Sequence, residues 1–156
     1  MPFAPPFQLG PFTVDAAGRL APLDPDAGPA FLFRWRDRLF RARITQPDAA
    51  EGRLTMQVPL GRVPSSARAP AARPDSFALV RLTAQAFPGE WRVRLLPDHR
   101  VRLEAQASLP LPVTAVALLA EVTRFLLALA PYLDLFDESG MAVPELVSAA
   151  GGNAKT

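Results

Sequence analysis

Cysteine is absent from the 156 residues of this chain, and histidine and lysine occur once each, as His99 and Lys155. Without cysteine the chain can form no disulfide, no thiol nucleophile and no cysteine-ligated zinc site. One histidine cannot assemble the usual ligand sets of zinc either. This composition suits a reducing compartment, and we expect a cytoplasmic protein that holds no metal.

Sequence motifs of catalysis are also missing. There is no glycine-rich phosphate loop, no G-x-S-x-G and no H-E-x-x-H. His99 falls in a predicted turn beside Asp98, where a general base has neither a partner nor a pocket. We therefore predict that the protein is not an enzyme and that it has no catalytic residues and no cofactor.

A long apolar stretch covers residues 113–133, but it is interrupted by charge. Glu121 and Arg124 lie at its centre, and Pro131 lies near its end. A charge at the middle of a membrane span costs about 2.5–3.5 kcal/mol on insertion scales. We expect a buried helix of a soluble domain here, with no membrane contact. The first residues lack a basic segment followed by an apolar one, so we expect no signal peptide.

Charge is distributed unevenly although its net value is only +2. Residues 30–102 hold fourteen arginines and six acidic residues, whereas residues 103–156 hold two basic and six acidic residues. The basic surplus therefore lies in the middle of the chain and consists of arginine. Such a surplus attracts phosphates, carboxylates or an acidic partner.

Residues 30–45 give the clearest local pattern. Aromatic residues at 31, 33 and 35 alternate with Leu32, Arg34 and Arg36. After a turn predicted at 37–38, the alternation of apolar residues with arginines resumes at Phe40. A period of two with aromatic residues predicts a hairpin that is apolar on one face and arginine-rich on the other. We expect the aromatic side chains to pack in the core.

The same pattern recurs further along the chain. A third strand is predicted over residues 53–58, and a second hairpin over 91–105 turns at 97–99. We expect Trp91, on its apolar face, to pack in the core as well. A shorter hairpin is predicted to pair residues 12–14 with 19–20.

Two helices are predicted between and after the hairpins. Asp75 and Ser76 offer an N-cap, apolar residues follow at helical spacing, and Pro88–Gly89 ends the helix. A strand over 77–86 is an alternative, since both of its alternating sets are mixed. Thr114 can cap a second helix that covers residues 115–130.

This order of elements predicts an α+β fold. We expect one antiparallel sheet, in the order β-β-β-α-β-β-α, with the helices packed on one face. The predicted domain covers residues 30–136 and includes a mobile linker at 59–74. A Pro-rich segment (1–29) precedes it and a flexible tail (137–156) follows it.

The run from Asp75 to Phe136 resembles the type III secretion chaperone-like fold, in its YbjN-like (bacterial sensory transduction regulator) branch. The resemblance rests on the helix Ser76–Phe87, the turn Pro97-Asp98-His99, and Leu109-Pro110-Leu111-Pro112 before a long final helix. It covers about 60 residues well, and residues 30–58 by pattern only. It implies a homodimer that binds other polypeptides without chemistry.

The arginines of the two hairpins form the first candidate binding face. If both hairpins join one sheet, these side chains share the face that the helices leave free. The alternative is a solvated outer face with no binding role. No aromatic residues are expected among the arginines on that face, which argues against nucleic acid. The residues are Arg34, Arg36, Arg41, Arg43, Arg92, Arg94, Arg100 and Arg102.

The final helix is the second candidate, because apolar residues surround most of it. The surplus apolar surface can meet a second copy or another partner, or can be buried completely against the sheet. The candidate residues are Leu118, Leu119, Val122, Phe125, Leu126 and Leu129. We predict a homodimeric, protein-binding module that is chaperone-like or regulatory. The alternative function is a binder of anionic ligands or acidic partners through the arginines.

Overall fold

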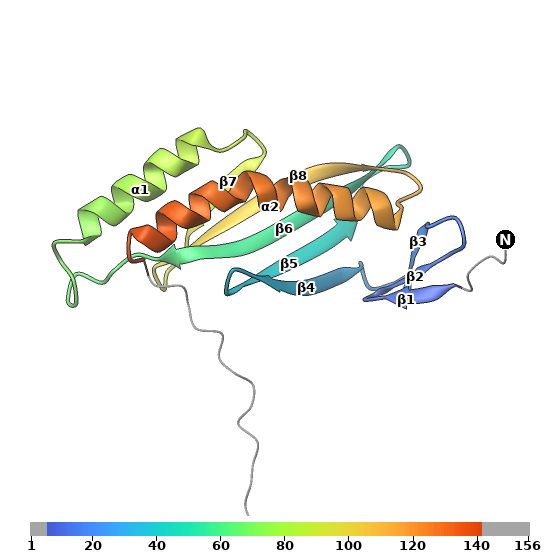
Figure 1. Ribbon diagram of the computed structural model, residues 1–156, viewed down its shortest axis with the longest axis horizontal. Coiled ribbons are helices and arrows are strands. Elements are labelled where there is room, and N and C mark those ends of the chain that lie inside the picture. The colour runs from blue at the N-terminus through green and yellow to red at the C-terminus, as the bar shows by residue number, and fades with distance from the viewer. Residues whose placement is uncertain (1–5, 142–156) are drawn as a thin grey trace, which may run out of the picture.

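The computed structural model describes residues 6–141 (Figure 1). Strands between residues 30 and 110 form one five-stranded antiparallel sheet, and the described residues include two helices. The strands, in spatial order, are β4 (Ala30–Trp35), β5 (Arg38–Thr45), β6 (Glu51–Arg62), β8 (Arg100–Pro110) and β7 (Trp91–Leu95). The helices are α1 (Arg73–Ala86) and α2 (Ala115–Glu138).

The prediction of a single sheet is wrong. A second, three-stranded antiparallel sheet is formed by β1 (Phe7–Leu9), β2 (Phe12–Val14) and β3 (Leu20–Pro22). The β2–β3 turn is closed by the Asp15 carboxylate, which accepts the backbone N–H groups of Ala17 and Arg19 at 2.8 and 2.9 Å. Gly18 adopts a φ of 77° that this turn requires.

The small sheet stays separate because of the residues that follow it. Prolines at 22, 25 and 29 remove backbone donors where a strand would have to continue. Leu20 instead donates its N–H to the Val113 carbonyl at 2.8 Å, just before α2. Figure 1 shows the small sheet at one end of the long axis and α1 toward the other.

The hairpin of β4 and β5 turns one residue earlier than predicted. Its two turn residues are Arg36 and Asp37, with φ values of 47° and 57°. Two left-handed residues match the right-handed twist of a two-residue hairpin. Arg38 therefore becomes the first residue of β5, paired with Trp35, and its side chain is buried.

Strand β6 extends into the predicted linker. It includes Pro59 and ends at Arg62, and its pairing with β8 shifts register between Pro59 and Gly61. A proline lacks the backbone donor that a regular ladder needs, and it is tolerated at such an irregularity. The non-strand connection to α1 therefore begins only after residue 62.

Both predicted helices form, with altered limits. Helix α1 begins at Arg73, with Pro74 in its first turn, rather than at an Asp75–Ser76 cap. Helix α2 begins as expected, since the Thr114 hydroxyl accepts the Ala117 N–H at 3.1 Å. It then continues through Pro131 to Glu138. The predicted tail lies outside the described residues from residue 142 onward.

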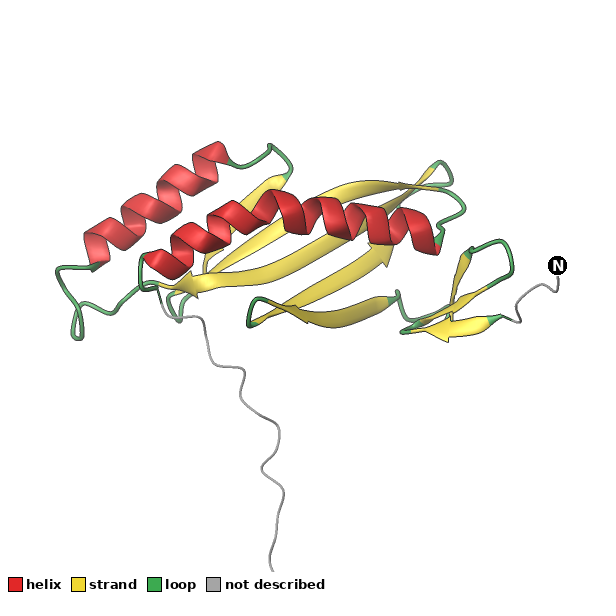
Figure 2. Cartoon of the chain, viewed as in Figure 1, coloured by secondary structure: helices red, strands yellow, loops and turns green. Residues whose placement is uncertain are grey.

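Helix α2 lies across one face of the large sheet (Figure 2). Five of its side chains are buried there: Leu118, Phe125, Leu129, Leu133 and Phe136. An aromatic chain links strands and helix, with Phe33 stacked on Phe40 at 4.9 Å and Trp91 edge-on to Phe125 at 5.0 Å. Trp35 and Trp91 are half-buried against this core. The other face of the sheet carries the arginines.

Candidate interaction surfaces

Seven of the eight predicted arginines share the sheet face opposite α2. Arg41 and Arg43 of β5 are exposed, whereas Phe40 and Ala42 between and beside them are buried on the helix side. The same alternation places the others on this outer face. They are Arg34 on β4, Arg92 and Arg94 on β7, and Arg100 and Arg102 on β8.

Two further arginines join this face. Arg53 pairs with Ser108, and Arg62 pairs with Arg100, in the β6–β8 ladder. Arg53 heads the predicted alternation of its strand, which would have been sufficient to find it. Arg62 lay in the predicted linker, so no pattern pointed to it. We call these nine residues the arginine face: Arg34, Arg41, Arg43, Arg53, Arg62, Arg92, Arg94, Arg100 and Arg102.

Positive charge on the arginine face is poorly neutralised. Within residues 6–141, Arg100 is the only one of the nine in an ion pair, which it forms with Asp98. Glu104 accepts a hydrogen bond from the Gln57 amide at 2.9 Å. Arg94 and Arg102 lie directly opposite each other in register. Like charges in that position destabilise a sheet, so the arrangement has a cost for folding.

The pKa of Asp98 is lowered by this environment. Desolvation raises it, but the backbone N–H and the guanidinium of Arg100, together with the charge of Arg62, outweigh that effect. Asp98 therefore stays ionised at the end of the arginine face and neutralises only its immediate neighbours.

Two shallow polar hollows lie side by side on this face. One has a volume of about 430 Å³ and is lined by Arg41, Arg43, Thr55 and Gln57. The other, of about 290 Å³, has Arg53 and Arg92 in its wall together with the carboxylates Glu51 and Glu90. Glu104 and Gln106 line both hollows and so divide them.

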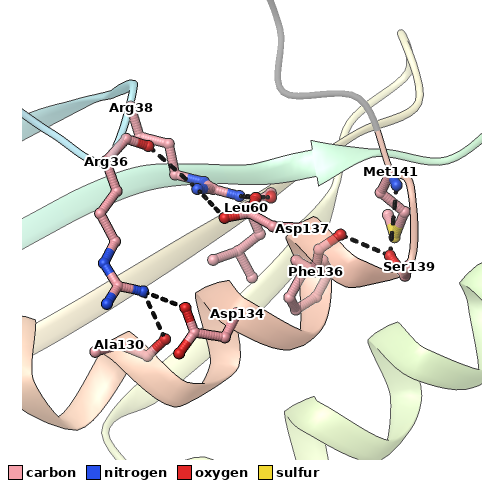
Figure 3. Close-up of polar contacts among 9 residues, drawn as sticks. All are labelled: Arg36, Arg38, Leu60, Ala130, Asp134, Phe136, Asp137, Ser139 and Met141. Atoms are coloured by element: carbon pink, nitrogen blue, oxygen red, sulfur yellow. Dashed lines mark hydrogen bonds and ion pairs between the residues drawn. The ribbon is translucent and has the colours of Figure 1, made fainter.

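Arg36 departs from the predicted face. Its guanidinium reaches α2, where it donates to the Ala130 carbonyl at 3.2 Å and pairs with Asp134 (Figure 3). It also lies over the Trp35 ring at 4.9 Å. The turn residue is left-handed, so its side chain leaves the alternation of the strand. Arg36 therefore holds α2 and takes no part in the arginine face.

The six candidate residues of the final helix do not lie together on a free surface. Leu118, Phe125 and Leu129 are buried, and Val122 and Leu126 pack partly against the core. Leu119 alone of the six is exposed. The free side of α2 is formed instead by four large residues, which we call the outer stripe. They are Val116, Leu119, Leu127 and Leu135, exposed by 76, 58, 69 and 47%.

A small apolar hollow adjoins α2. It has a volume of about 220 Å³, and Met56, Trp91, Ala105 and Phe125 are among its lining residues. By length and composition α2 is apolar enough to cross a membrane, a property that core helices of soluble proteins share. Here it packs on β6 and β8 with one side only. The outer stripe and this hollow are its uncovered apolar surface.

Residues that could act in catalysis or bind a metal are scattered over the part of the chain that the structure describes. His99 occupies the β7–β8 turn with a φ of 66°, and its N–H donates to the Leu96 carbonyl at 2.9 Å. In residues 6–141 no three His, Asp or Glu side chains come together to hold a metal ion. The arginine face and the outer stripe are therefore the features that suggest a role.

Comparison of the chain with family models, with curated proteins and with solved structures finds no match. The resemblance to the secretion chaperone-like fold stays a prediction.

Proposed function

We propose that this protein is a non-catalytic, cytoplasmic protein-binding module and that it binds through the outer stripe of α2. The first partner of the stripe is a second copy of the chain, so the module is a homodimer. The observation that carries this proposal is the exposure of four large aliphatic side chains of α2 between Val116 and Leu135. At 1.5 Å per residue the stripe runs about 28 Å along the helix.

The energetics suit an interface of moderate strength. Covering a half-exposed leucine or valine is worth about 1–2 kcal/mol, since full burial is worth about 1.5–3 kcal/mol. If each of two copies covers four such side chains, the total gain in free energy is comparable with the roughly 4–15 kcal/mol that association costs. Thr123 and Arg124, between Leu119 and Leu127, interrupt the middle of the stripe with polar groups. We therefore expect a reversible dimer.

Support for a second copy comes from symmetry. A two-fold axis brings the same helix face of both copies together, so an apolar stripe meets an apolar stripe without any other complementary surface. A chaperone-like or regulatory role follows if other polypeptides compete for the same stripe. The resemblance noted in the sequence favours such a role, although it contributes no residue-level site.

Sedimentation velocity tests the proposal. We expect a concentration-dependent monomer–dimer equilibrium for the wild-type chain, and a monomer for Leu119→Ser/Leu127→Ser. The matched control is Leu23→Ser, which removes an exposed leucine (49%) outside α2 and should leave the dimer intact. Circular dichroism checks that all three chains are folded. A wild-type monomer at every concentration contradicts the proposal, as does a double variant that dimerises like the wild type.

A further inference from the structure

The two sides of the large sheet differ in charge. The arginine face carries nine arginines, and four acidic residues lie on its strands, turns and hollows: Glu51, Glu90, Asp98 and Glu104. On the other side, the last turns of α2 carry Asp134, Asp137 and Glu138 and no basic residue. A face with such a surplus of positive charge costs stability by self-repulsion. An external partner that supplies negative charge removes that cost.

The larger hollow suits carboxylates. Arg41 and Arg43 are two residues apart on β5, so their side chains leave the strand about 7 Å apart. Arginine forms two parallel hydrogen bonds to a carboxylate, which fixes direction as well as charge. Thr55 and Gln57 line the same hollow and add a hydroxyl and an amide that can bond to peptide groups. In an extended peptide, alternate side chains on one face are also about 7 Å apart.

The distribution of charge on the arginine face indicates which class of polyanion fits it. Glu104 lies between the two hollows, so a nucleic-acid backbone crossing the sheet would bring phosphates against a carboxylate. Separate acidic side chains can avoid Glu104 and still reach the arginines on either side. The aromatic residues of the sheet, including Phe33 and Trp91, belong to the opposite, core-facing side and cannot stack on bases.

An anionic membrane fits the face less well. Membrane-bound surfaces combine basic residues with apolar groups that enter the lipid. On the outer face of this sheet, Leu32 is the one large apolar side chain that is more than half exposed in the described residues. We propose that the arginine face is a second binding surface, distinct from the outer stripe, and that its partner is an acidic, extended segment of another polypeptide.

Fluorescence anisotropy with defined probes tests this assignment. The probe is a short labelled peptide of alternating glutamate and serine, compared with a single-stranded oligodeoxynucleotide of equal charge and with vesicles of equal parts phosphatidylcholine and phosphatidylserine. We expect the peptide to bind most tightly and its affinity to fall as salt is raised. Arg41→Gln/Arg43→Gln should raise its dissociation constant at least about tenfold.

The matched control is Arg68→Gln/Arg81→Gln, which removes the same charge from exposed positions outside both the arginine face and the outer stripe. It should leave the dissociation constant within about twofold of the wild type, because distant exposed charges are screened. Equal weakening by both variants would mean attraction to net charge alone and overturns the proposal. Tighter binding of the oligonucleotide or the vesicles also overturns it. Neither result bears on the dimer, which sedimentation tests separately.

Discussion

Arg38 is fully buried, and its guanidinium donates to the carboxylate of Asp137 at 2.6 Å. It also donates to the Leu60 carbonyl at 3.0 Å, which joins β5, β6 and α2 in one polar cluster. Three acidic residues crowd the last turns of α2, where the helix dipole already disfavours negative charge. Arg36 and Arg38 supply the missing positive charge from the sheet, as Figure 3 shows.

Replacing Arg38 by methionine should lower the free energy of unfolding by about 2–4 kcal/mol. The change removes charge-assisted hydrogen bonds and leaves the Leu60 carbonyl without this buried donor. Asp137 is half-exposed and can regain water, which keeps the loss below that of a fully buried pair. Urea denaturation measures the difference.

Arg36→Met is the control for the Arg38 variant. Its ion pair with Asp134 is exposed, with side-chain exposures of 37% and 56%, so its loss should cost less than about 1 kcal/mol. Equal effects of the two substitutions would show that burial does not distinguish the two arginines.

Asp98 should make stability depend on pH in acid. Because its pKa in the folded chain is below the ordinary value, its contribution is present at neutral pH and is lost as pH falls through the folded pKa. We expect the wild type to melt above Asp98→Asn at pH 7 and the two melting curves to converge in strong acid. A difference that does not change with pH would contradict the assigned ion pair with Arg100.

His99 should tolerate glycine better than a branched residue. Its φ of 66° lies in the left-handed region, which costs a side-chain-bearing residue about 1–2 kcal/mol and glycine nothing. Glycine loses part of that gain to the entropy of the unfolded chain. His99→Gly should therefore change the free energy of unfolding by less than about 1 kcal/mol, whereas His99→Val should lower it by more. Thermal unfolding of both variants decides between this turn role and a packing role.

Alternation made the large sheet predictable. The buried residues Phe40, Ala42 and Ile44 recur at every second position, a period that fits a strand and not a helix. The same rule placed seven of the nine arginines on one face. Arg38 was misplaced because a one-residue shift of the turn reverses the face of each strand residue next to it.

The small sheet was predicted only in part, and the outer stripe was not predicted. The expected hairpin of residues 12–14 and 19–20 is formed by β2 and β3, but β1 was not expected, because strands of three residues are too short to show a period. Helix α2 is apolar around most of its circumference, so its sequence does not reveal which side meets the sheet. Only the packing of Leu118, Phe125 and Leu129 on the core leaves Leu119 and Leu127 outward.

Thiol labelling at the outer stripe tests the central claim most directly. The chain contains no cysteine, so Leu127→Cys carries a single thiol at the centre of the proposed interface, and Leu23→Cys carries one at an exposed control position. We predict that the maleimide reaction rate at position 127 falls as the protein concentration is raised, in proportion to the fraction of chains that remain monomeric. The rate at position 23 should stay constant. Rates that are independent of concentration at both positions would contradict binding through α2.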